Sequence, residues 1–308
     1  MRILITGGTG FVGSNLDGDI RLSSKDADLR DLDAAVAIFE EHRPDLIVHA
    51  AARHGNFAQI ADDKVGYYRD NALININVFE AARLVGVRDL MAFSSVTAFP
   101  DHISAFAEED LYKGQPHDSC YPYAYAKRMI DVLSRAYREQ YALNYNCIFL
   151  ANAYGPRGRD NVIPLLIRKC LDAKREQTPF EILGDGSPRR DFIFIDDVKS
   201  IIKLLQHCQY FGPVTFSSGT SVSIREVVTE IVEAVGFEGP VIWKETEDVG
   251  QQEKVPSNKK LVNLLPEFAF TPLADGIKKT VEWYLDNPEI MKESSRIVQD
   301  ATPWKNSN

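Results

Sequence analysis

The sequence predicts an α/β protein built on a doubly wound parallel sheet, with a smaller second α/β lobe. Short apolar runs alternate with helical patterns through the first half of the 308-residue chain. These runs are apolar at consecutive positions, as expected of strands that are buried on both faces of a parallel sheet. A glycine-rich turn separates the first run from the first helical pattern, which is typical of the same class of fold.

The predicted elements of the first half follow one another in the order that parallel strands joined by helices require. Strands are expected at residues 2–8, 19–24, 45–52, 90–95 and 144–152. Helices are expected at residues 9–16, 31–43, 71–86 and 123–141. The first of these helices is short because the polar segment SNLDGD ends it before the second strand.

The second half of the chain loses this regular alternation. Turn residues are expected at 183–191 and a buried strand at 191–198, with helices at 162–176, 224–236 and 273–287. Because no long linker or repeat separates the halves, we expect the second lobe to pack tightly on the first. The predicted Rossmann domain covers residues 1–160 with a returning segment at about 191–219, and the substrate-binding lobe covers 161–190 and 220–308.

Composition and charge exclude several classes of protein. Charged residues make up 26% and hydrophobic residues 44% of the chain, which is ordinary for a soluble globular protein. No apolar run approaches the length of a bilayer span, and the first residues do not form a signal peptide, so no membrane partner is expected. A net charge of −9 argues against a nucleic-acid partner.

The cysteines and acidic pairs do not form a metal-binding pattern. Cysteines are scattered at positions 120, 147, 170 and 208, which is typical of buried reduced thiols in a cytoplasmic protein. Asp196 and Asp197 are adjacent in the strand predicted at 191–198, where neighbouring side chains point to opposite faces. We therefore expect no metal site and a cytoplasmic location.

The turn ITGGTGFVG predicts a dinucleotide-binding site. Gly7, Gly10 and Gly13 follow the first strand and open the first helix. Glycines at these positions let the backbone approach a pyrophosphate, which the unpaired amides and the dipole of the helix attract. The position of the turn, between the first strand and first helix of a parallel sheet, distinguishes it from an ordinary glycine turn.

The end of the second predicted strand favours NADP over NAD. Ser23, Ser24 and Lys25 stand where an acidic residue would bind the ribose hydroxyls of NAD. Two hydroxyls and an ammonium can bind a 2′-phosphate instead. Asp26 and Asp28 follow closely, which weakens the preference without reversing it.

A tyrosine and a lysine of the fourth predicted helix form a candidate pair for proton transfer. Tyr123 stands four residues before Lys127 and shares its helix face, whereas Tyr121 and Tyr125 point elsewhere. An ammonium beside a phenol favours the phenolate, so the pair predicts a lowered pKa for Tyr123. Because the preceding strand ends in Ser95 at the carboxyl edge of the sheet, we expect Ser95 to bind the reacting oxygen beside the phenol.

These residues and several further motifs carry a resemblance that covers nearly the whole chain. The motifs are MRILITGGTGFVG, SSKDADL, FPD, YAYAKRMIDVLSRAY, NAYGP, GDGSPRRDFI and LLPEFAFTP. The chain resembles the extended short-chain dehydrogenase/reductase family, that is, the NAD-dependent epimerases/dehydratases, and within it most closely the GDP-L-fucose synthases. The resemblance implies a bilobal fold, a homodimer formed through helices of the first lobe, and NADPH that reduces a 4-keto nucleotide sugar.

The resemblance also implies the residues of both ligand sites. Those for NADP(H) are Gly7, Gly10, Phe11, Val12, Gly13, Ser24, Lys25, Asp28, Leu29, Ala50, Ala51, Ala52, Lys127, Leu150 and Asn152. Those for the GDP-linked sugar are Ser95, Thr97, Asn152, Asn161, Val162, Lys169, Leu183, Arg190 and Lys254. Lys169, Arg190 and Lys254 are the cations that an anionic diphosphate needs. Leu183 stands where the family often has a tryptophan, which removes a stacking surface.

Two positions depart from the pattern of the family. Its GDP-L-fucose synthases epimerise C3 and C5 with a cysteine two residues after the catalytic serine and a histidine before a V-[IL]-P segment. Here those positions hold Thr97 and Asn161. A threonine hydroxyl is a very weak acid and an asparagine amide does not titrate, so neither can remove a proton from carbon and return it near neutral pH.

The resulting hypothesis is a C4-ketoreductase that keeps Ser95, Tyr123 and Lys127 and has lost epimerisation. Its substrate would be a GDP-linked deoxyhexose or heptose destined for a surface polysaccharide. His54, His117 or Cys120 could instead carry epimerisation, which leaves a complete GDP-L-fucose synthase or another nucleotide-sugar epimerase as an alternative. A nucleotide-binding protein without catalysis is a more distant alternative, and the complete Ser-Tyr-Lys set argues against it.

Overall fold

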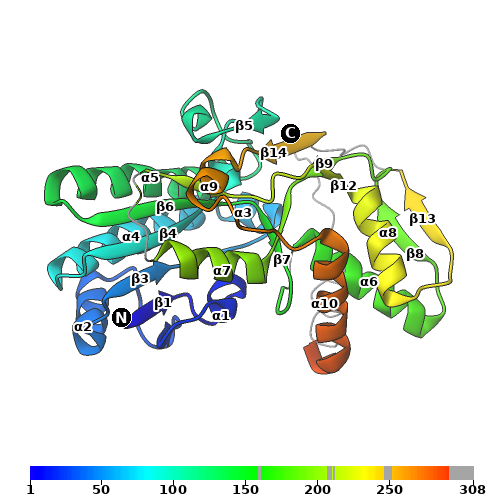
Figure 1. Ribbon diagram of the computed structural model, residues 1–308, viewed down its shortest axis with the longest axis horizontal. Helices are drawn as coiled ribbons and strands as arrows, with labels where there is room; N and C mark the ends of the chain where they lie inside the picture. Colours follow the sequence, from blue (N-terminus) through cyan, green and yellow to red (C-terminus); the bar gives the residue numbers. More distant parts are fainter. Residues whose placement is uncertain (159–160, 207–209, 211, 246–251, 291–308) are drawn as a thin grey trace.

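The computed structural model describes residues 1–158, 161–206, 210, 212–245 and 252–290. It contains a six-stranded parallel sheet with helices on both faces, and a smaller α/β lobe beside it (Figure 1). The strand order is β11-β6-β4-β3-β1-β2, so the chain reverses direction across the sheet at β1. The predicted doubly wound α/β fold is confirmed.

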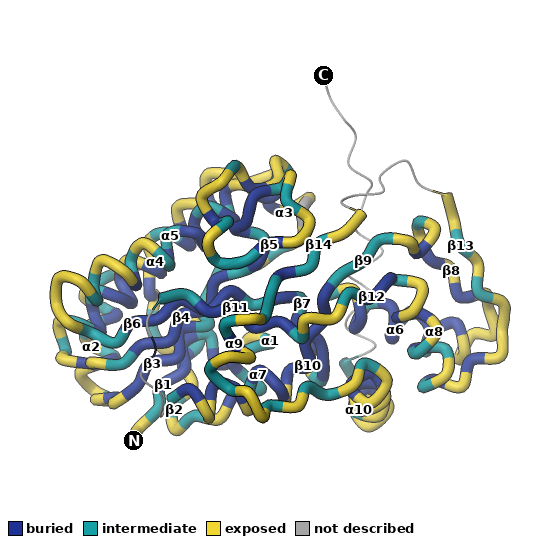
Figure 2. Tube along the Cα trace, turned by 45° about the horizontal axis from the view of Figure 1, so that its top comes forward, coloured by how far each residue is buried: buried dark blue, intermediate teal, exposed yellow. Residues whose placement is uncertain are grey.

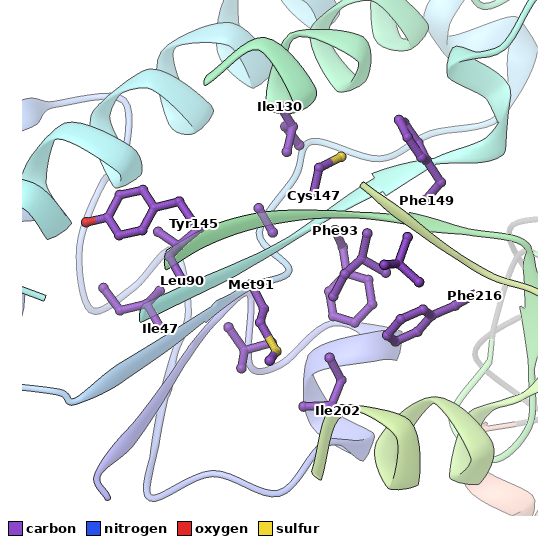
Figure 3. Packing of buried hydrophobic residues seen from close by; sticks show 14 of the residues in the cluster. Ile47, Leu90, Met91, Phe93, Ile130, Tyr145, Cys147, Phe149, Ile202 and Phe216 are labelled. Carbon is purple, nitrogen blue, oxygen red and sulfur yellow. The ribbon is translucent and has the colours of Figure 1, made fainter. Parts of the chain in front are cut away.

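The sheet strands are buried along most of their length, as their sequences predict, except that Arg21 at the edge of the sheet is exposed. They are β1 (Ile3–Thr6), β2 (Ile20–Leu22), β3 (Leu46–His49), β4 (Asp89–Ser95), β6 (Asn144–Leu150) and β11 (Val214–Phe216). Helices α4 (Lys64–Leu84) and α5 (Tyr121–Tyr141) pack together on one face with α2 (Leu32–His42), and α1 (Phe11–Asn15) packs with α7 (Ile195–Leu205) on the other. Figure 3 shows Ile130 and Cys147 on one side of these strands and Met91 and Ile202 on the other.

The helix expected at 71–86 begins earlier than its apolar pattern indicates. Helix α4 starts at Lys64 because the Asp63 carboxylate accepts a hydrogen bond from the backbone amide of Gly66. A further short helix, α3 (Phe57–Asp62), begins with a reciprocal capping box between Asn56 and Gln59. Both starts depend on caps rather than on apolar periodicity, which is why the pattern missed them.

The strand expected at 191–198 is wrong over most of its length. Strand β10 covers Phe192–Phe194, and helix α7 then begins at Ile195. Ile195, Val198, Ile201, Ile202 and Leu205 are buried with helical spacing. Asp196 and Asp197 therefore lie in the first turn of a helix, and the Asp197 carboxylate accepts hydrogen bonds from the amide and hydroxyl of Thr271.

The second lobe has its own core. Its helices are α6 (Val162–Glu176), α8 (Ile224–Val235) and α10 (Leu273–Asp286), which pack on one another. Strands β8 (Phe180–Leu183) and β13 (Val241–Lys244) form a parallel pair beside them. The buried apolar side chains of this lobe form one cluster, and those of the six-stranded sheet form another. Figure 2 shows the two buried regions joined by the central segments β7 (Asn152–Tyr154) and β10.

A small sheet that the sequence did not predict crosses between the lobes. Its order is β12-β9-β14-β5, with bounds β12 (Val222–Ser223), β9 (Arg189–Arg190), β14 (Glu253–Pro256) and β5 (Ala105–Phe106). The remaining short elements are η1 (Val96–Ala98), η2 (Glu108–Asp110) and α9 (Lys259–Leu264). The sheet brings segments far apart in sequence to the carboxyl edge of the main sheet (Figure 1).

The cysteines and helices also bear on compartment. Cys120, Cys147 and Cys170 are buried free thiols, and Cys208 lies outside the described residues. Within the described ranges, every helix is too short or too polar to cross a lipid bilayer. In the same part of the chain, no three His, Cys, Asp or Glu side chains lie together as metal ligands would.

Candidate active site

Ser95 is the last residue of β4, at the carboxyl edge of the sheet. Its backbone is extended and pairs in register with Leu150 of β6. The Ser95 hydroxyl oxygen accepts hydrogen bonds from the Thr97 amide at 3.2 Å and from the Thr97 hydroxyl at 2.9 Å. These bonds start the 3₁₀ turn η1 and leave the Ser95 hydroxyl hydrogen for another acceptor.

Lys127 lies on α5 behind Ser95 and is 4% exposed. Its ammonium donates to the carbonyl oxygen of Phe93 on β4 at 2.9 Å and lies 5.9 Å from the ring centroid of Tyr123. Burial disfavours the charged form and lowers the pKa of Lys127 to about 8. Lys127 thus bonds to the strand that ends in Ser95 and lies near Tyr123, while the joint action of the three side chains stays a prediction.

The expected lowering of the Tyr123 pKa is wrong. Burial raises the pKa of this phenol, and the neighbouring Cys120 thiol raises it further. The Lys127 ammonium donates its hydrogen bond to a backbone carbonyl and not to this phenol. Tyr123 therefore stays a neutral phenol, which is the form that donates a proton.

The first turns of α5 are held against β4 by side chains on both sides of Lys127. The Ser94 hydroxyl donates to the carbonyl oxygen of Lys127 at 2.8 Å. The buried Arg128 guanidinium donates to the carbonyl oxygens of Ala98 and Gly114. Since Ala98 belongs to η1, these bonds join the tyrosine helix to the turn that carries Thr97.

The glycine-rich turn has the shape that a pyrophosphate requires. Gly7 has a φ of +66°, and a Cβ there would lie 2.7 Å from the backbone of Ala51. A Cβ on Gly13 would collide with the carbonyl oxygen of Gly7, so α1 approaches β1 closely only with glycine here. Gly10 caps α1, and Phe11 and Val12 are its first residues. These residues fit a dinucleotide.

The 2′-phosphate position is only partly as the sequence predicts. Ser23 does not point its hydroxyl outward: both its hydroxyl and its amide donate to the Asp26 carboxylate at 2.7 Å. Ser24 and Lys25 are exposed beside it. Asp28 forms a salt bridge of 2.7 Å with Arg30, whose hydrogen bonds lower the Asp28 pKa to about 2. A paired carboxylate repels a phosphate less than a free one would.

The other predicted cofactor residues gather at the ends of neighbouring strands. Ala50, Ala51 and Ala52 follow β3, and the Ala51 amide donates to the Thr6 hydroxyl at 3.3 Å. Leu150 ends β6, and Leu29 is buried beside the second strand. The Asn152 side chain donates to the carbonyl oxygen of Asp191, at the start of the returning segment, at 2.8 Å.

Two of the three predicted cations lie side by side. Arg190 on β9 and Lys254 on β14 are opposite each other in the parallel pairing of these strands. Burial lowers the pKa of both, and Arg190 lowers that of Lys254 further. The Cys120 thiol and the Asp101 carboxyl raise the pKa of Lys254, which indicates that both lie near it. An anion between Arg190 and Lys254 would relieve their mutual repulsion.

The remaining substrate candidates are farther apart along the chain. Asn161 caps α6, and its amide donates to the carbonyl oxygen of Ala153 at 2.7 Å. Lys169 is half-buried on the same helix, while Val162 is exposed at its start. Leu183 ends β8 and is 71% exposed, so it offers an open apolar surface.

Two of the possible replacement groups for epimerisation adjoin Tyr123. The His54 ring meets the Tyr123 ring edge-on with centroids 6.0 Å apart. Cys120 is buried just before α5, and burial raises the pKa of its thiol. His117 is exposed and bonds to the hydroxyl of Ser119 at 2.7 Å. Sequence reasoning missed two buried polar residues behind the site, His49 and Asn75, because both stand inside apolar patterns.

Comparison with known proteins agrees with this architecture. Residues 3–213 match the model of the NAD dependent epimerase/dehydratase family. GDP-L-fucose synthase of Dictyostelium discoideum is 33% identical over 94% of this chain and 97% of its own length. A solved GDP-L-fucose synthetase from Naegleria fowleri bound to NADP has a TM-score of 0.85 at 33% identity, covering 93% of each chain. A GDP-mannoheptose C4 reductase from Campylobacter jejuni with NADP bound has a TM-score of 0.84 at 25% identity, covering 92% of this chain and 98% of its own.

Proposed function

The chain belongs to the NAD-dependent epimerase/dehydratase family, and we propose that it is an NADPH-dependent C4-ketoreductase of a GDP-linked 4-keto deoxyhexose or heptose, without epimerisation at C3 or C5. The observation that supports the proposal is the bond from Lys127, which lies near Tyr123 on α5, to Phe93 of the strand that ends in Ser95. Thr97 and Asn161 stand at the two epimerase positions of the family. The protein is an NADP-dependent oxidoreductase of GDP-sugars, as its relatives among GDP-L-fucose synthases and heptose reductases support.

The reduction needs one hydride and one proton. When bound at the glycine-rich turn, NADPH supplies the hydride that converts the C4 carbonyl to an alcohol. Tyr123 donates its phenolic proton to the C4 oxygen, and the Ser95 hydroxyl hydrogen-bonds the same oxygen. The ammonium of Lys127 stabilises the phenolate that forms, and the phenolate then regains a proton from water.

The hydrogen bonds of Thr97 and Asn161 support the proposed absence of epimerisation. The Thr97 hydroxyl donates to the Ser95 oxygen, and the Asn161 amide donates to a backbone carbonyl. Both side chains thus have structural partners, and neither has a pKa near neutrality. This supports a substrate whose stereochemistry at C3 and C5 is already set.

The diphosphate end of the substrate would lie across the small sheet between the lobes. Arg190 and Lys254 are paired across β9 and β14, and a bridging diphosphate would neutralise both. Lys169 on α6 would contribute a further cation. Leu183, which is 71% exposed, would offer the nucleotide an aliphatic surface in place of an aromatic one.

A homodimer through α4 and α5 accounts for the apolar surface of the first lobe. Val65 and Tyr68 on α4, and Tyr121 and Val132 on α5, are exposed by 74%, 48%, 41% and 54%. They line a groove of about 710 Å³ between the two helices. A second copy of the chain would bury this surface. The buried free thiols favour a cytoplasmic location for the dimer.

One experiment tests the proposed reaction. The protein would be incubated with NADPH and a GDP-4-keto-6-deoxyhexose in heavy water, and the product examined by mass spectrometry and NMR. Consumption of NADPH with no deuterium at C3 or C5 is expected. Deuterium at either carbon would instead favour a complete GDP-L-fucose synthase. Failure to oxidise NADPH with deoxyhexose and heptose substrates alike would contradict a reductase.

A further inference from the structure

We propose that His49 is a positioning residue, which sets Lys127 against the cofactor-binding turn through a directed chain of hydrogen bonds. The inference rests on the proposed reduction, because it assigns Lys127 a role in that reaction. His49 ends β3 and is fully buried. It is more than 70 residues from Lys127 in the sequence, and its link to the site exists only in the fold.

The imidazole of His49 joins a strand to a helix. Its Nδ1 lies 2.7 Å from the hydroxyl oxygen of Thr6, the last residue of β1. Its Nε2 lies 3.1 Å from the side-chain oxygen of Asn75, which is buried on α4. Thr6 is directly followed by Gly7, so one end of this link is the start of the glycine-rich turn.

The series of hydrogen bonds through His49 continues at both ends. At one end, the amide of Ala51 donates to the Thr6 hydroxyl oxygen at 3.3 Å, and Ala51 is the residue against which Gly7 packs. At the other end, the side-chain amide of Asn75 donates to the carbonyl oxygen of Ala126 at 2.8 Å. Ala126 directly precedes Lys127 on α5. The cofactor turn and the lysine are thus joined without a gap.

The backbone carbonyl at one end of these hydrogen bonds sets the tautomer of a neutral His49. A backbone carbonyl can only accept, so the Asn75 amide nitrogen faces Ala126 and its oxygen faces His49. Nε2 of His49 must then carry the hydrogen, and in a neutral ring Nδ1 accepts from the Thr6 hydroxyl. The Thr6 oxygen in turn accepts from the Ala51 amide. Of the two neutral tautomers, only the Nε2-H form satisfies the whole set of hydrogen bonds.

The environment keeps the imidazole in that neutral form. Burial lowers the pKa of His49 to about 3, and the charge of Lys127 lowers it in the same direction. His49 therefore does not titrate where the enzyme would work, and it is a fixed spacer rather than a proton carrier. Because the two positive charges repel each other, a charged His49 would lower the pKa of Lys127.

The consequence is that α5 is held at Lys127 from two directions. Ser94 on β4 holds the carbonyl of Lys127, and Asn75 holds the carbonyl of the preceding residue. Without His49, the Asn75 amide could rotate and the second hold would be lost. Small displacements of a reacting group cost rate even where binding is unchanged.

Three variants test the proposal: His49→Phe, His49→Gln and the control Tyr145→Phe. Phenylalanine keeps the ring and removes both bonds, whereas glutamine keeps an acceptor and a donor at similar spacing. Tyr145 is fully buried in the same domain, and its hydroxyl donates to the carbonyl oxygen of Val87 away from the site. The control therefore loses a buried hydrogen bond but leaves the hydrogen bonds through His49 unchanged.

We expect His49→Phe to lower kcat by about tenfold or more, with KM for the sugar changed less than about threefold. Its affinity for NADPH, measured by fluorescence without sugar, should fall by a few fold, because the hydrogen bonds through His49 end at the glycine-rich turn. His49→Gln should recover most of kcat. Unchanged kcat in His49→Phe, or a loss no greater than that of Tyr145→Phe at matched thermal stability, would overturn the proposal.

A direct observation separates this inference from the reaction itself. NMR of protein labelled with ¹⁵N-histidine, with His49 assigned through His49→Gln, should show a protonated Nε2 and an unprotonated Nδ1 across neutral pH. The other tautomer, or a charged ring, would contradict the chain of bonds. If the parent protein reduces no GDP-4-keto sugar, the proposed function fails, while the tautomer and the NADPH affinity still decide whether His49 acts as inferred.

Discussion

The ammonium of Lys127 donates its hydrogen bond to the carbonyl oxygen of Phe93, at 2.9 Å, and not to the phenol one helical turn away. This bond ties the lysine to the strand that ends in Ser95. Burial raises the pKa of Tyr123 and lowers that of Lys127 to about 8. In the proposed reaction the neutral phenol donates its proton, and the ammonium of Lys127 stabilises the phenolate that forms.

Removing the phenolic hydroxyl should abolish reduction without removing the cofactor site. We expect Tyr123→Phe to lower kcat by about 10²- to 10⁴-fold, the usual contribution of a positioned general acid. NADPH affinity should stay within about twofold. Tyr125→Phe is the matched control, because Tyr125 stacks with Arg128 at 5.1 Å on the same helix. A Tyr123→Phe variant as active as Tyr125→Phe would rule out the proposed acid.

The proposed reaction should weaken above the pKa of Lys127. That pKa is lowered from 10.5 to about 8, so the stabilising charge is present below pH 8 and is lost as pH rises through that value. A pH profile of kcat at saturating NADPH and sugar should therefore fall above about pH 8. Lys127→Arg, which stays charged, should be slower but flat across the same range. A parent profile that stays level up to pH 10 would exclude this role for the lysine.

Restoring the two missing groups should restore carbon exchange. The double variant Thr97→Cys, Asn161→His places a thiol and an imidazole at the epimerase positions of the family. In heavy water it should introduce deuterium at C3 or C5 of the GDP-4-keto sugar, because these groups titrate near neutrality. Each single variant serves as a control and should exchange more slowly. Equal exchange in the parent protein would show that other groups already do this work.

Neutralising either paired cation should weaken substrate binding more than catalysis. Arg190→Ala and Lys254→Ala should each raise KM for the GDP-sugar by about tenfold, the value of a charge-assisted hydrogen bond to phosphate. NADPH affinity should be unchanged. Lys244→Ala is the control, since that lysine is exposed and pairs with Glu181 at 3.0 Å. If its KM rises equally, general electrostatics rather than a diphosphate contact is responsible.

A charge in the apolar groove should disrupt the proposed dimer. Val65 on α4 is 74% exposed and lines the groove, so Val65→Glu should convert a dimer to a monomer in sedimentation experiments. Val262→Glu, on α9 and 41% exposed, should leave the dimer intact. A parent protein that sediments as a monomer at micromolar concentration would exclude this interface.

The packing of one strand supports the proposed division into domains. Ile193 of β10 belongs to the core of the first lobe, whereas Phe192 and Phe194 belong to that of the second. We propose that the segment from 191 returns to the first lobe for this reason, so that its residues 191–219 divide the second lobe in sequence. Alternating faces of a short strand serve both cores.

The sequence predicted the elements whose structure depends on residues close together in the chain. The strand ending in Ser95, the turn through Gly7 and Gly13, and the helix carrying Tyr123 and Lys127 all stand as their local patterns predict. It failed at Ile195, where apolar residues with helical spacing followed a strand directly and were taken for its continuation. It also missed α3, whose start depends on a cap between Asn56 and Gln59.

The sequence by itself determined the fold class, the dinucleotide turn and the helix that carries the proposed proton-transfer residues, because spacing along the chain sets which residues share a strand, a turn or a helix face. Only the tertiary structure decided that Lys127 bonds to Phe93, that Arg190 meets Lys254, and that His49 reaches α5 through Asn75. These relations join residues far apart in the chain. The pKa values of Tyr123, Lys127 and His49 depend on how deeply each group is buried, and a local sequence pattern does not show this.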